Sequence, residues 1–190
     1  EMCIRDRALT TNGSQLADSG HALRDAGVNS INISLDSLRA ERFKAITRIG
    51  DLNTVLRGID RAVECGFDRI RLNAVILDGL NRDEVVPLTH YALEKGIHIA
   101  FIEEMPLGQV NVGGKPLAYV SSDTLQKELA EHFTLVPMTA SDTAGPARDF
   151  LIAGSQTQVG FISPHSHNFC AQCNRLRISA EGRLLMCLGN

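Results

Sequence analysis

A repeated unit, in which a helical segment ends at a glycine and an apolar strand follows at once, most constrains the fold of this chain. The sequence predicts three such units, with helices over residues 16–26, 54–65 and 81–95 and strands over residues 30–36, 69–77 and 97–105. Glycine just after a helix adopts the left-handed conformation that ends it. Helices and strands that alternate in this way favour right-handed crossovers and a parallel sheet. The chain is therefore predicted to have an α/β fold, with a shorter helix over residues 41–46.

The predicted strands alternate polar and apolar side chains. Asn32, Ser34 and Asp36 fall on one face of their strand, and Arg71 and Asn73 fall on one face of the next. A parallel sheet that is covered on both sides would instead be apolar throughout. A solvated sheet edge explains a single polar stripe. Because the stripe recurs on neighbouring strands, we favour a polar face that lines a site inside a curved, partly open barrel.

The character of the sequence changes after Pro106. A glycine-rich loop over residues 108–116 is followed by a helix over residues 123–133, capped by Ser121 or Ser122. Short strands are expected over residues 133–136, 149–152 and 158–162. We therefore expect a partial barrel over residues 8–106 and a small irregular α+β unit over residues 107–190. The charged, aperiodic residues 1–7 are interpreted as a possible non-native leader, and the end at Asn190 as a truncation.

Charge and cysteine content narrow the class of protein. The net charge of −3, with both signs mixed, argues against a nucleic-acid or membrane-surface binder, and no apolar run reaches transmembrane length. Three of the five cysteines crowd into the last twenty-one residues. Such crowding suits metal ligation in a reducing compartment better than disulfides, so we expect a cytoplasmic protein. The isolated Cys3 is expected to have no role.

The crowded cysteines have the spacing of a metal site. Cys170 and Cys173 form a C-x-x-C pair, and a hairpin over residues 178–185 that turns at Glu181-Gly182 is expected to return Cys187 to them. Zinc needs a fourth ligand in a closed site, which His165 or His167 would supply. An iron–sulfur cluster held by three cysteines would leave one iron open to a ligand. Spacing alone leaves both alternatives open.

Two arginines follow the C-x-x-C pair. Arg175 and Arg177 are two residues apart, so they project to the same side of an extended segment. Guanidinium groups arranged in this way suit phosphate oxygens, and a closed structural zinc site has no need of them. The alternative is that the two arginines lie on a solvent-exposed basic strand at the edge of a sheet and bind no ligand.

Several segments now resemble one known family. The strongest is residues 169–179 (FCAQCNRLRIS), followed by residues 181–184 (EGRL) and 187–188 (CL). Weaker segments agree in order: LTTNG at 9–13, INISLDS at 31–37, LNAV at 72–75, FIE at 101–103 with Met105, GPA at 145–147 and GFIS at 160–163. Together they resemble the GTP 3′,8-cyclase family of radical S-adenosylmethionine (SAM) enzymes, which opens molybdenum cofactor biosynthesis.

The resemblance implies the C-terminal part of an incomplete (βα)6 barrel with a small cluster-binding unit. It implies a [4Fe-4S] cluster on Cys170, Cys173 and Cys187, a second, N-terminal cluster in the full-length protein, and SAM as cofactor. In the family reaction a SAM-derived radical removes a hydrogen from ribose C3′ of GTP, and the sugar radical then bonds to guanine C8. The implied GTP contacts are Thr10, Arg71, Arg175, Leu176 and Arg177, and the implied SAM contacts are Ser34 and Met105.

Three departures from the family pattern matter. Arg71 stands where the family usually has a lysine, and Ala100 stands where it usually has an arginine. The C-x3-C-x2-C motif of the SAM-cleaving cluster is not found, so we expect the chain alone to be inactive.

The partners that the resemblance implies are GTP, a second copy of the chain in a homodimer, and the downstream cyclic pyranopterin monophosphate synthase.

Two other functions stay open. One is a radical SAM enzyme that modifies peptides and carries an auxiliary cluster, although such an enzyme has no reason for the N-R-L-R run at residues 174–177. The other is a non-catalytic α/β binding module stapled by zinc, which metal analysis would separate from an iron–sulfur protein.

Overall fold

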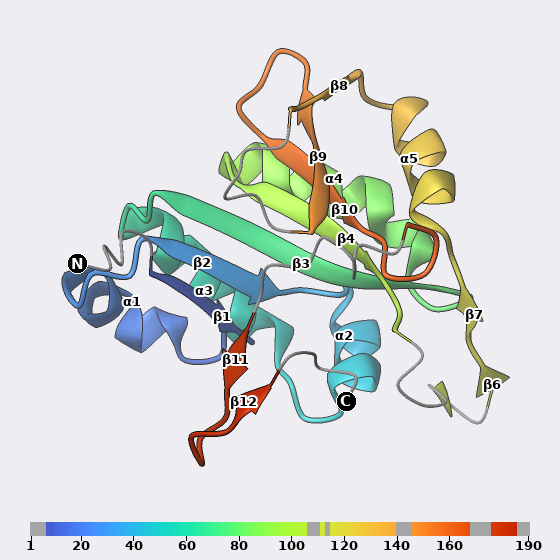
Figure 1. The fold of residues 1–190 in the computed structure, drawn as a ribbon. Coiled ribbons are helices and arrows are strands. Elements are labelled where there is room, and N and C mark those ends of the chain that lie inside the picture. The colour runs from blue at the N-terminus through green and yellow to red at the C-terminus, as the bar shows by residue number, and fades with distance from the viewer. Residues whose placement is uncertain (1–6, 106–110, 113–114, 140–145, 168–175, 186–190) are drawn as a thin grey trace.

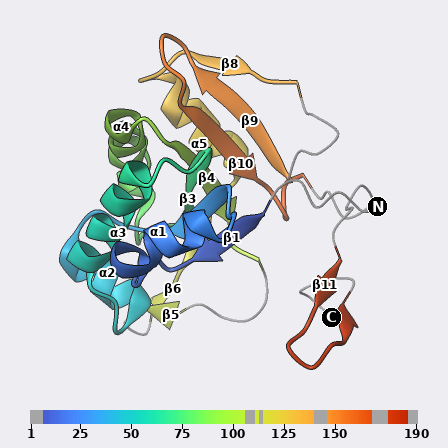
Figure 2. The same cartoon turned by 90° about the vertical axis from the view of Figure 1, so that its left-hand side faces the viewer.

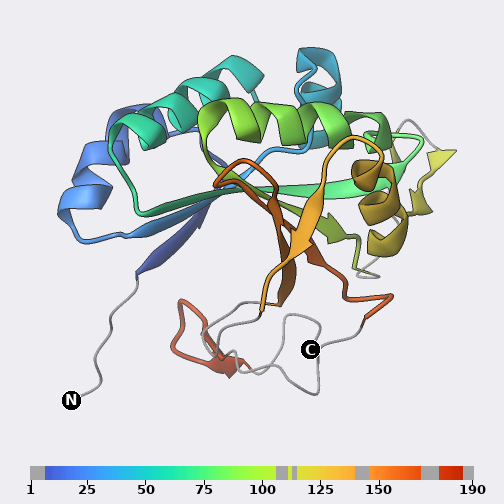
Figure 3. The same ribbon diagram turned by 90° about the horizontal axis from the view of Figure 1, so that it is seen from above.

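The computed structural model describes residues 7–105, 111–112, 115–139, 146–167 and 176–185 (Figure 1). A mixed sheet forms its centre, and helices lie along one side of that sheet. Figure 3 shows the helices of the first half of the chain on one side of the sheet and the β11–β12 hairpin on the other. We call the sheet surface that faces away from the helices the open face.

The first half of the chain follows the predicted order of helices and strands. Its elements are β1 (Ala8–Thr11), α1 (Leu16–Asp25), β2 (Ser30–Ser34), α2 (Ala40–Thr47), α3 (Leu52–Glu64), β3 (Arg69–Asp78), the 3-10 helix η1 (Arg82–Glu84), α4 (Val85–Lys95) and β4 (His98–Glu103). Strands β1 to β4 pair in sequence order and are all parallel. The predicted parallel α/β sheet is therefore confirmed, whereas closure into an incomplete barrel stays a prediction.

The second half extends the same sheet. Its elements are β5 (Asn111–Val112), β6 (Lys115–Pro116), β7 (Ala118–Tyr119), α5 (Ser122–Ala130), β8 (Leu135–Pro137), β9 (Ala147–Ile152), β10 (Gln158–Ile162), β11 (Arg177–Ile178) and β12 (Leu184–Leu185). Strand β10 pairs with β4 in parallel, and β9 and β8 follow in antiparallel orientation. Figure 2 shows β8, β9 and β10 at the same end of the molecule as α4 and α5. One sheet thus runs across the predicted boundary at residue 106.

Helix ends follow the local sequence signals. Gly27, Gly66 and Gly96 have φ values of 85°, 66° and 65°, the left-handed conformation predicted for glycine after a helix. Helix α3 begins two residues earlier than expected because Asp51 caps it, accepting a hydrogen bond of 2.8 Å from the Thr54 amide. The side chain of Ser121 caps α5 in the same way.

The core lies between the helices and the sheet. Ile31, Ile33 and Leu35 point into it from β2 and the residue after it, and Ile70, Leu72 and Ala74 do so from β3. The buried face of α3 consists of Leu52, Val55, Gly58, Ile59 and Ala62. Val63, on the same helix, is 38% exposed. In the part of the chain that the structure describes, no helix has the length and hydropathy needed to cross a bilayer.

Candidate functional site on the open face of the sheet

Parallel pairing arranges the residues of the open face, several of them polar, in two rows. The first row crosses four strands in register and consists of Thr10, Asn32, Arg71 and His98. The second row lies one step further along the strands and consists of Ser34, Asn73, Ala100 and Gly160. The predicted polar face is therefore present. It brings Thr10 and Arg71, both predicted GTP contacts, into one row, next to the row that holds Ser34, a predicted SAM contact.

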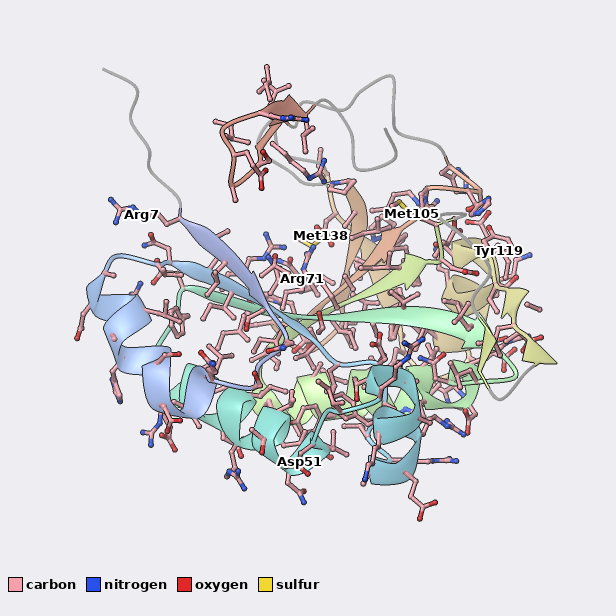
Figure 4. All side chains as sticks on the ribbon, turned by 90° about the horizontal axis from the view of Figure 1, so that it is seen from below. Arg7, Asp51, Arg71, Met105, Tyr119 and Met138 are labelled. Carbon is pink, nitrogen blue, oxygen red and sulfur yellow. The ribbon has the colours of Figure 1, made fainter. Side chains whose placement is uncertain are left out.

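Arg71 is the most buried cation of this face. The residue is 9% exposed, and its Nη2 lies 2.8 Å from Oδ1 of Asp149 in β9. Figure 4 shows Arg71 on the side of the sheet away from the helices. Arg71 Nε and Asn73 Oδ1 are both buried and have no hydrogen-bond partner among the described residues. Buried polar atoms are normally paired, so this donor and this acceptor are candidates for contact with a bound ligand.

His98 contributes no positive charge near neutral pH. Burial, followed by the charges of Arg69 and Arg71, lowers the pKa of His98 to about 4. Its Nδ1 accepts a hydrogen bond of 3.1 Å from the Gln158 amide, which fixes the ring. The cationic character of this part of the face therefore comes from the two arginines, and Asp149 offsets part of it.

Glu103, at the end of β4, ties the segment just before the cysteines to the sheet. The residue is 1% exposed. Its Oε1 accepts hydrogen bonds from the Ser122 amide (2.7 Å) and Ser166 Oγ (2.5 Å), and its Oε2 accepts from the amides of His165 (3.1 Å) and Ser166 (3.0 Å). Burial alone would raise the pKa of Glu103, but the bonds from Ser166 and Ser122 outweigh it and lower that pKa to about 2.

Sequence reasoning assigned no role to Glu103 or Asp149. The signal for Glu103 was available, since an acid within an otherwise apolar strand needs partners when it is buried. Asp149 gave no comparable signal, because its partner Arg71 lies 78 positions away in the sequence.

Both histidines considered as zinc ligands have other partners. His167 Nε2 lies 3.1 Å from Oδ2 of Asp123. The His165 ring packs on Tyr119 with 4.9 Å between ring centroids, and its amide is bonded to Glu103. The contact of His167 engages one of its two ring nitrogens, and the contacts of His165 engage its ring face and its backbone amide.

The cysteine site itself lies outside the described residues, as do Cys170, Cys173, Cys187 and Arg175. Among the residues that the structure does describe, no group of three or more metal-ligating side chains gathers. The predicted hairpin is confirmed: Arg177 pairs with Leu185 and Ile178 with Leu184 in antiparallel orientation, and Gly182 in the turn has a φ of 78°. The chain that follows Cys173 is thereby brought alongside the chain that precedes Cys187.

The remaining predicted contacts are accessible to a ligand in different degrees. Thr10 and Ser34 are exposed, and Met105, just after β4, is half-buried. Leu176 is 63% exposed, and Arg177 is half-buried. Figure 4 places Met105 and Met138 on the same side of the sheet as Arg71.

Comparison with known proteins relates both halves of the chain to described families. Residues 3–92 match the model of the Radical SAM superfamily, and residues 97–190 match the model Molybdenum Cofactor Synthesis C. The boundary between the two matches falls before β4, so the second match includes the strand that carries Glu103.

Curated relatives match almost the whole chain. A protein of Pseudomonas entomophila (strain L48) named GTP 3′,8-cyclase is 54% identical over 188 residues, which is 98% of this chain and 56% of the relative. Proteins of the same name from Saccharophagus degradans and Marinobacter nauticus are 50% and 51% identical over 187 residues, again 98% of this chain and 56% of each relative. The chain thus spans about half the length of the curated relatives it matches.

Proposed function

We propose that this chain, which belongs to the radical SAM superfamily and carries a molybdenum cofactor synthesis C segment, is part of a GTP 3′,8-cyclase. The proposed reaction joins ribose C3′ of GTP to guanine C8, giving (8S)-3′,8-cyclo-7,8-dihydroguanosine 5′-triphosphate, in molybdenum cofactor biosynthesis. The observation that carries the proposal is the pair of in-register polar rows on the open face, in which residues expected to contact GTP and SAM stand on adjacent rows.

The open face has the chemistry to hold a nucleoside triphosphate. Within the described part of the chain, Arg71 presents a buried, unpaired Nε donor, and Asn73 presents an unpaired Oδ1 acceptor. GTP offers acceptors on its phosphates and donors on its ribose and guanine, so it can satisfy both kinds of atom. Arg175 and Arg177 would add charge for the triphosphate from the hairpin side. In this proposal Thr10 and Arg71 orient GTP, while Ser34 and Met105 hold SAM beside it. The two reactants are thereby held in a fixed orientation relative to each other.

The donor set at the end of the chain fits a [4Fe-4S] cluster. Three cysteines would ligate three irons and leave the fourth free to bind a ligand, and the β11–β12 pairing supports their convergence. When bound, this cluster would supply an open iron for the guanine of GTP, and SAM together with the second, N-terminal cluster of the full-length protein would supply the radical chemistry that amino-acid side chains lack. The contribution of this chain is to bind the ligands and to position them. Glu103 anchors the segment before Cys170 to β4, and hence to the sheet that carries Arg71.

The alternative of a zinc-stapled binding module is less well supported. It would use His165 or His167 as the fourth ligand, and a closed site of that kind has no need of the two arginines that follow Cys173. A peptide-modifying enzyme with an auxiliary cluster is disfavoured by the 54% identity to a protein named GTP 3′,8-cyclase. We further propose a cytoplasmic homodimer whose product passes to cyclic pyranopterin monophosphate synthase.

Anaerobic reconstitution with iron and sulfide tests this proposal. We expect about four irons per chain, the broad visible absorption of a [4Fe-4S] cluster, and an electron paramagnetic resonance spectrum of the reduced cluster that changes when GTP is added. A change on adding GTP, but not ATP, would support guanine recognition at the open iron. Tight stoichiometric zinc without that absorption would overturn the assignment of the metal, and an unchanged spectrum would overturn the assignment of the ligand.

A further inference from the structure

We propose that Asp149 is a positioning residue for the ligand-binding cation Arg71, and that Gly160 provides the space Asp149 needs to do so. The inference deepens the proposed function and rests on it, because the ligand of Arg71 is taken to be the nucleoside triphosphate. Three observations carry it: the Arg71–Asp149 ion pair, the unpaired Nε of Arg71, and the close approach of Asp149 to Gly160.

The ion pair is the only hydrogen-bonded contact of the Arg71 guanidinium within the described residues. Asp149 Oδ1 accepts from Nη2 at 2.8 Å, while Nε is buried and unpaired. An arginine side chain has about 2 kcal/mol of rotamer entropy to lose when it is held in one position. A carboxylate that already fixes one end of the guanidinium removes part of that cost before the ligand arrives. Asp149 therefore leaves the Nε edge oriented and available.

Gly160 makes this arrangement possible by its lack of a side chain. It pairs with Asp149 across β9 and β10, and a Cβ added at Gly160 would stand 2.5 Å from Asp149 Oδ1. Gly160 is not among the glycines with a positive φ, so the backbone itself would accept alanine. The glycine is thus needed for the room it leaves beside the carboxylate.

Asp149 also allows two arginines to stand on neighbouring positions of one strand face. Its Oδ2 lies 3.8 Å from Nη2 of Arg69. Burial lowers the pKa of Arg69, the charge of Arg71 lowers it further, and Asp149 acts in the opposite direction. One carboxylate shared by two guanidinium groups leaves a net charge of about +1 at the site, which still attracts an anion.

A competing account predicts the opposite change in ligand affinity when Asp149 is removed. If Asp149 merely neutralised Arg71, removing its charge would strengthen the binding of any anion. Positioning and neutralisation can therefore be separated by measuring affinity, because the first predicts weaker binding and the second predicts tighter binding when Asp149 is lost.

The test is isothermal titration of the reconstituted chain with GTP and with inorganic tripolyphosphate. We expect Asp149→Ala to weaken the binding of both ligands about tenfold, and Asp149→Asn, which keeps an acceptor in place, to weaken it less. Gly160→Ala displaces the carboxylate without removing its charge, and should resemble Asp149→Ala. The double variant Arg71→Ala/Asp149→Ala should bind no more weakly than Arg71→Ala, since Asp149 acts through Arg71 and its removal also frees Arg69.

Asp60→Ala is the matched control, because Asp60 forms its ion pair with Lys95 on the helix side of the sheet. It should leave both affinities unchanged. Tighter binding by Asp149→Ala, or additive losses in the double variant, would overturn the positioning role while leaving the proposed function intact. Failure of the unsubstituted chain to bind either ligand would overturn both.

Discussion

Replacing Glu103 with glutamine isolates the energetic value of the carboxylate that anchors the segment before the cysteines. Four donors converge on this buried side chain and lower its pKa from 4.5 to about 2. Glutamine has nearly the same shape, but its NH2 group would meet a backbone amide or a hydroxyl where the carboxylate now accepts. A difference of about 2.5 pKa units corresponds to roughly 3 kcal/mol of folding free energy at neutral pH.

The sign of the pH dependence follows from the lowered pKa. The stabilisation by Glu103 is complete above the unfolded pKa near 4.5 and is lost as the pH falls through the folded pKa near 2. Urea unfolding followed by circular dichroism should show Glu103→Gln less stable than the unsubstituted chain by about 3 kcal/mol at pH 7. At pH 3 the gap should shrink by about 2 kcal/mol, because the carboxylate alone responds to pH.

Glu104→Gln is the matched control, since Glu104 is the adjacent acid and is only half-buried. It should change stability by less than about 0.5 kcal/mol at either pH. A gap between Glu103→Gln and the unsubstituted chain that stays constant from pH 7 to pH 3 would refute the charge-based reasoning. We also expect Glu103→Gln to lower cluster content after reconstitution, because the segment before Cys170 loses its anchor.

Three further predictions concern the site. Arg177→Ala, and likewise Arg175→Ala, should weaken GTP binding about ten- to a hundredfold in isothermal titration and should leave the cluster absorption intact. Replacement by lysine should recover only part of the lost affinity. Loss of the cluster with unchanged GTP affinity would show that the two arginines have a structural role. Alanine at Cys187 should abolish the reconstituted [4Fe-4S] absorption, and a retained spectrum would exclude it as a ligand. Ala100→Arg should raise GTP affinity by adding a cation to the row of Ser34 and Asn73, and an unchanged affinity would show that other cations already suffice.

Much of the fold was predictable because it depends on local signals. The 3.6-residue and two-residue periodicities, together with Gly27, Gly66 and Gly96, predicted the helices and strands from α1 to β4 to within a few residues. The buried face of α3 was harder to predict, since it includes the small residues Gly58 and Ala62. At Gly58 an added Cβ would stand 2.5 Å from the carbonyl oxygen of Gly13, which explains the small residue.

The site was predictable only where its residues share a short motif. The cysteine and arginine motif is contiguous, and the polar face follows from alternation within single strands. Asp149 and the partners of Glu103 depend instead on pairing between distant segments, above all the insertion of β10 beside β4. No spacing rule in the sequence encodes that pairing, so the Arg71–Asp149 contact became visible only in the structure.

The pairing of β10 with β4 also bears on how the chain can be divided. The two family matches separate before β4, yet β4 is hydrogen-bonded to β3 on one side and to β10 on the other. A piece that ends near residue 105 would leave one side of β4 unpaired, and an unpaired apolar strand such as His98–Glu103 is a template for association with other chains. A piece that begins near residue 97 would lack β3 and expose the opposite side. The two halves are therefore expected to aggregate when expressed separately, although each corresponds to a named family of its own.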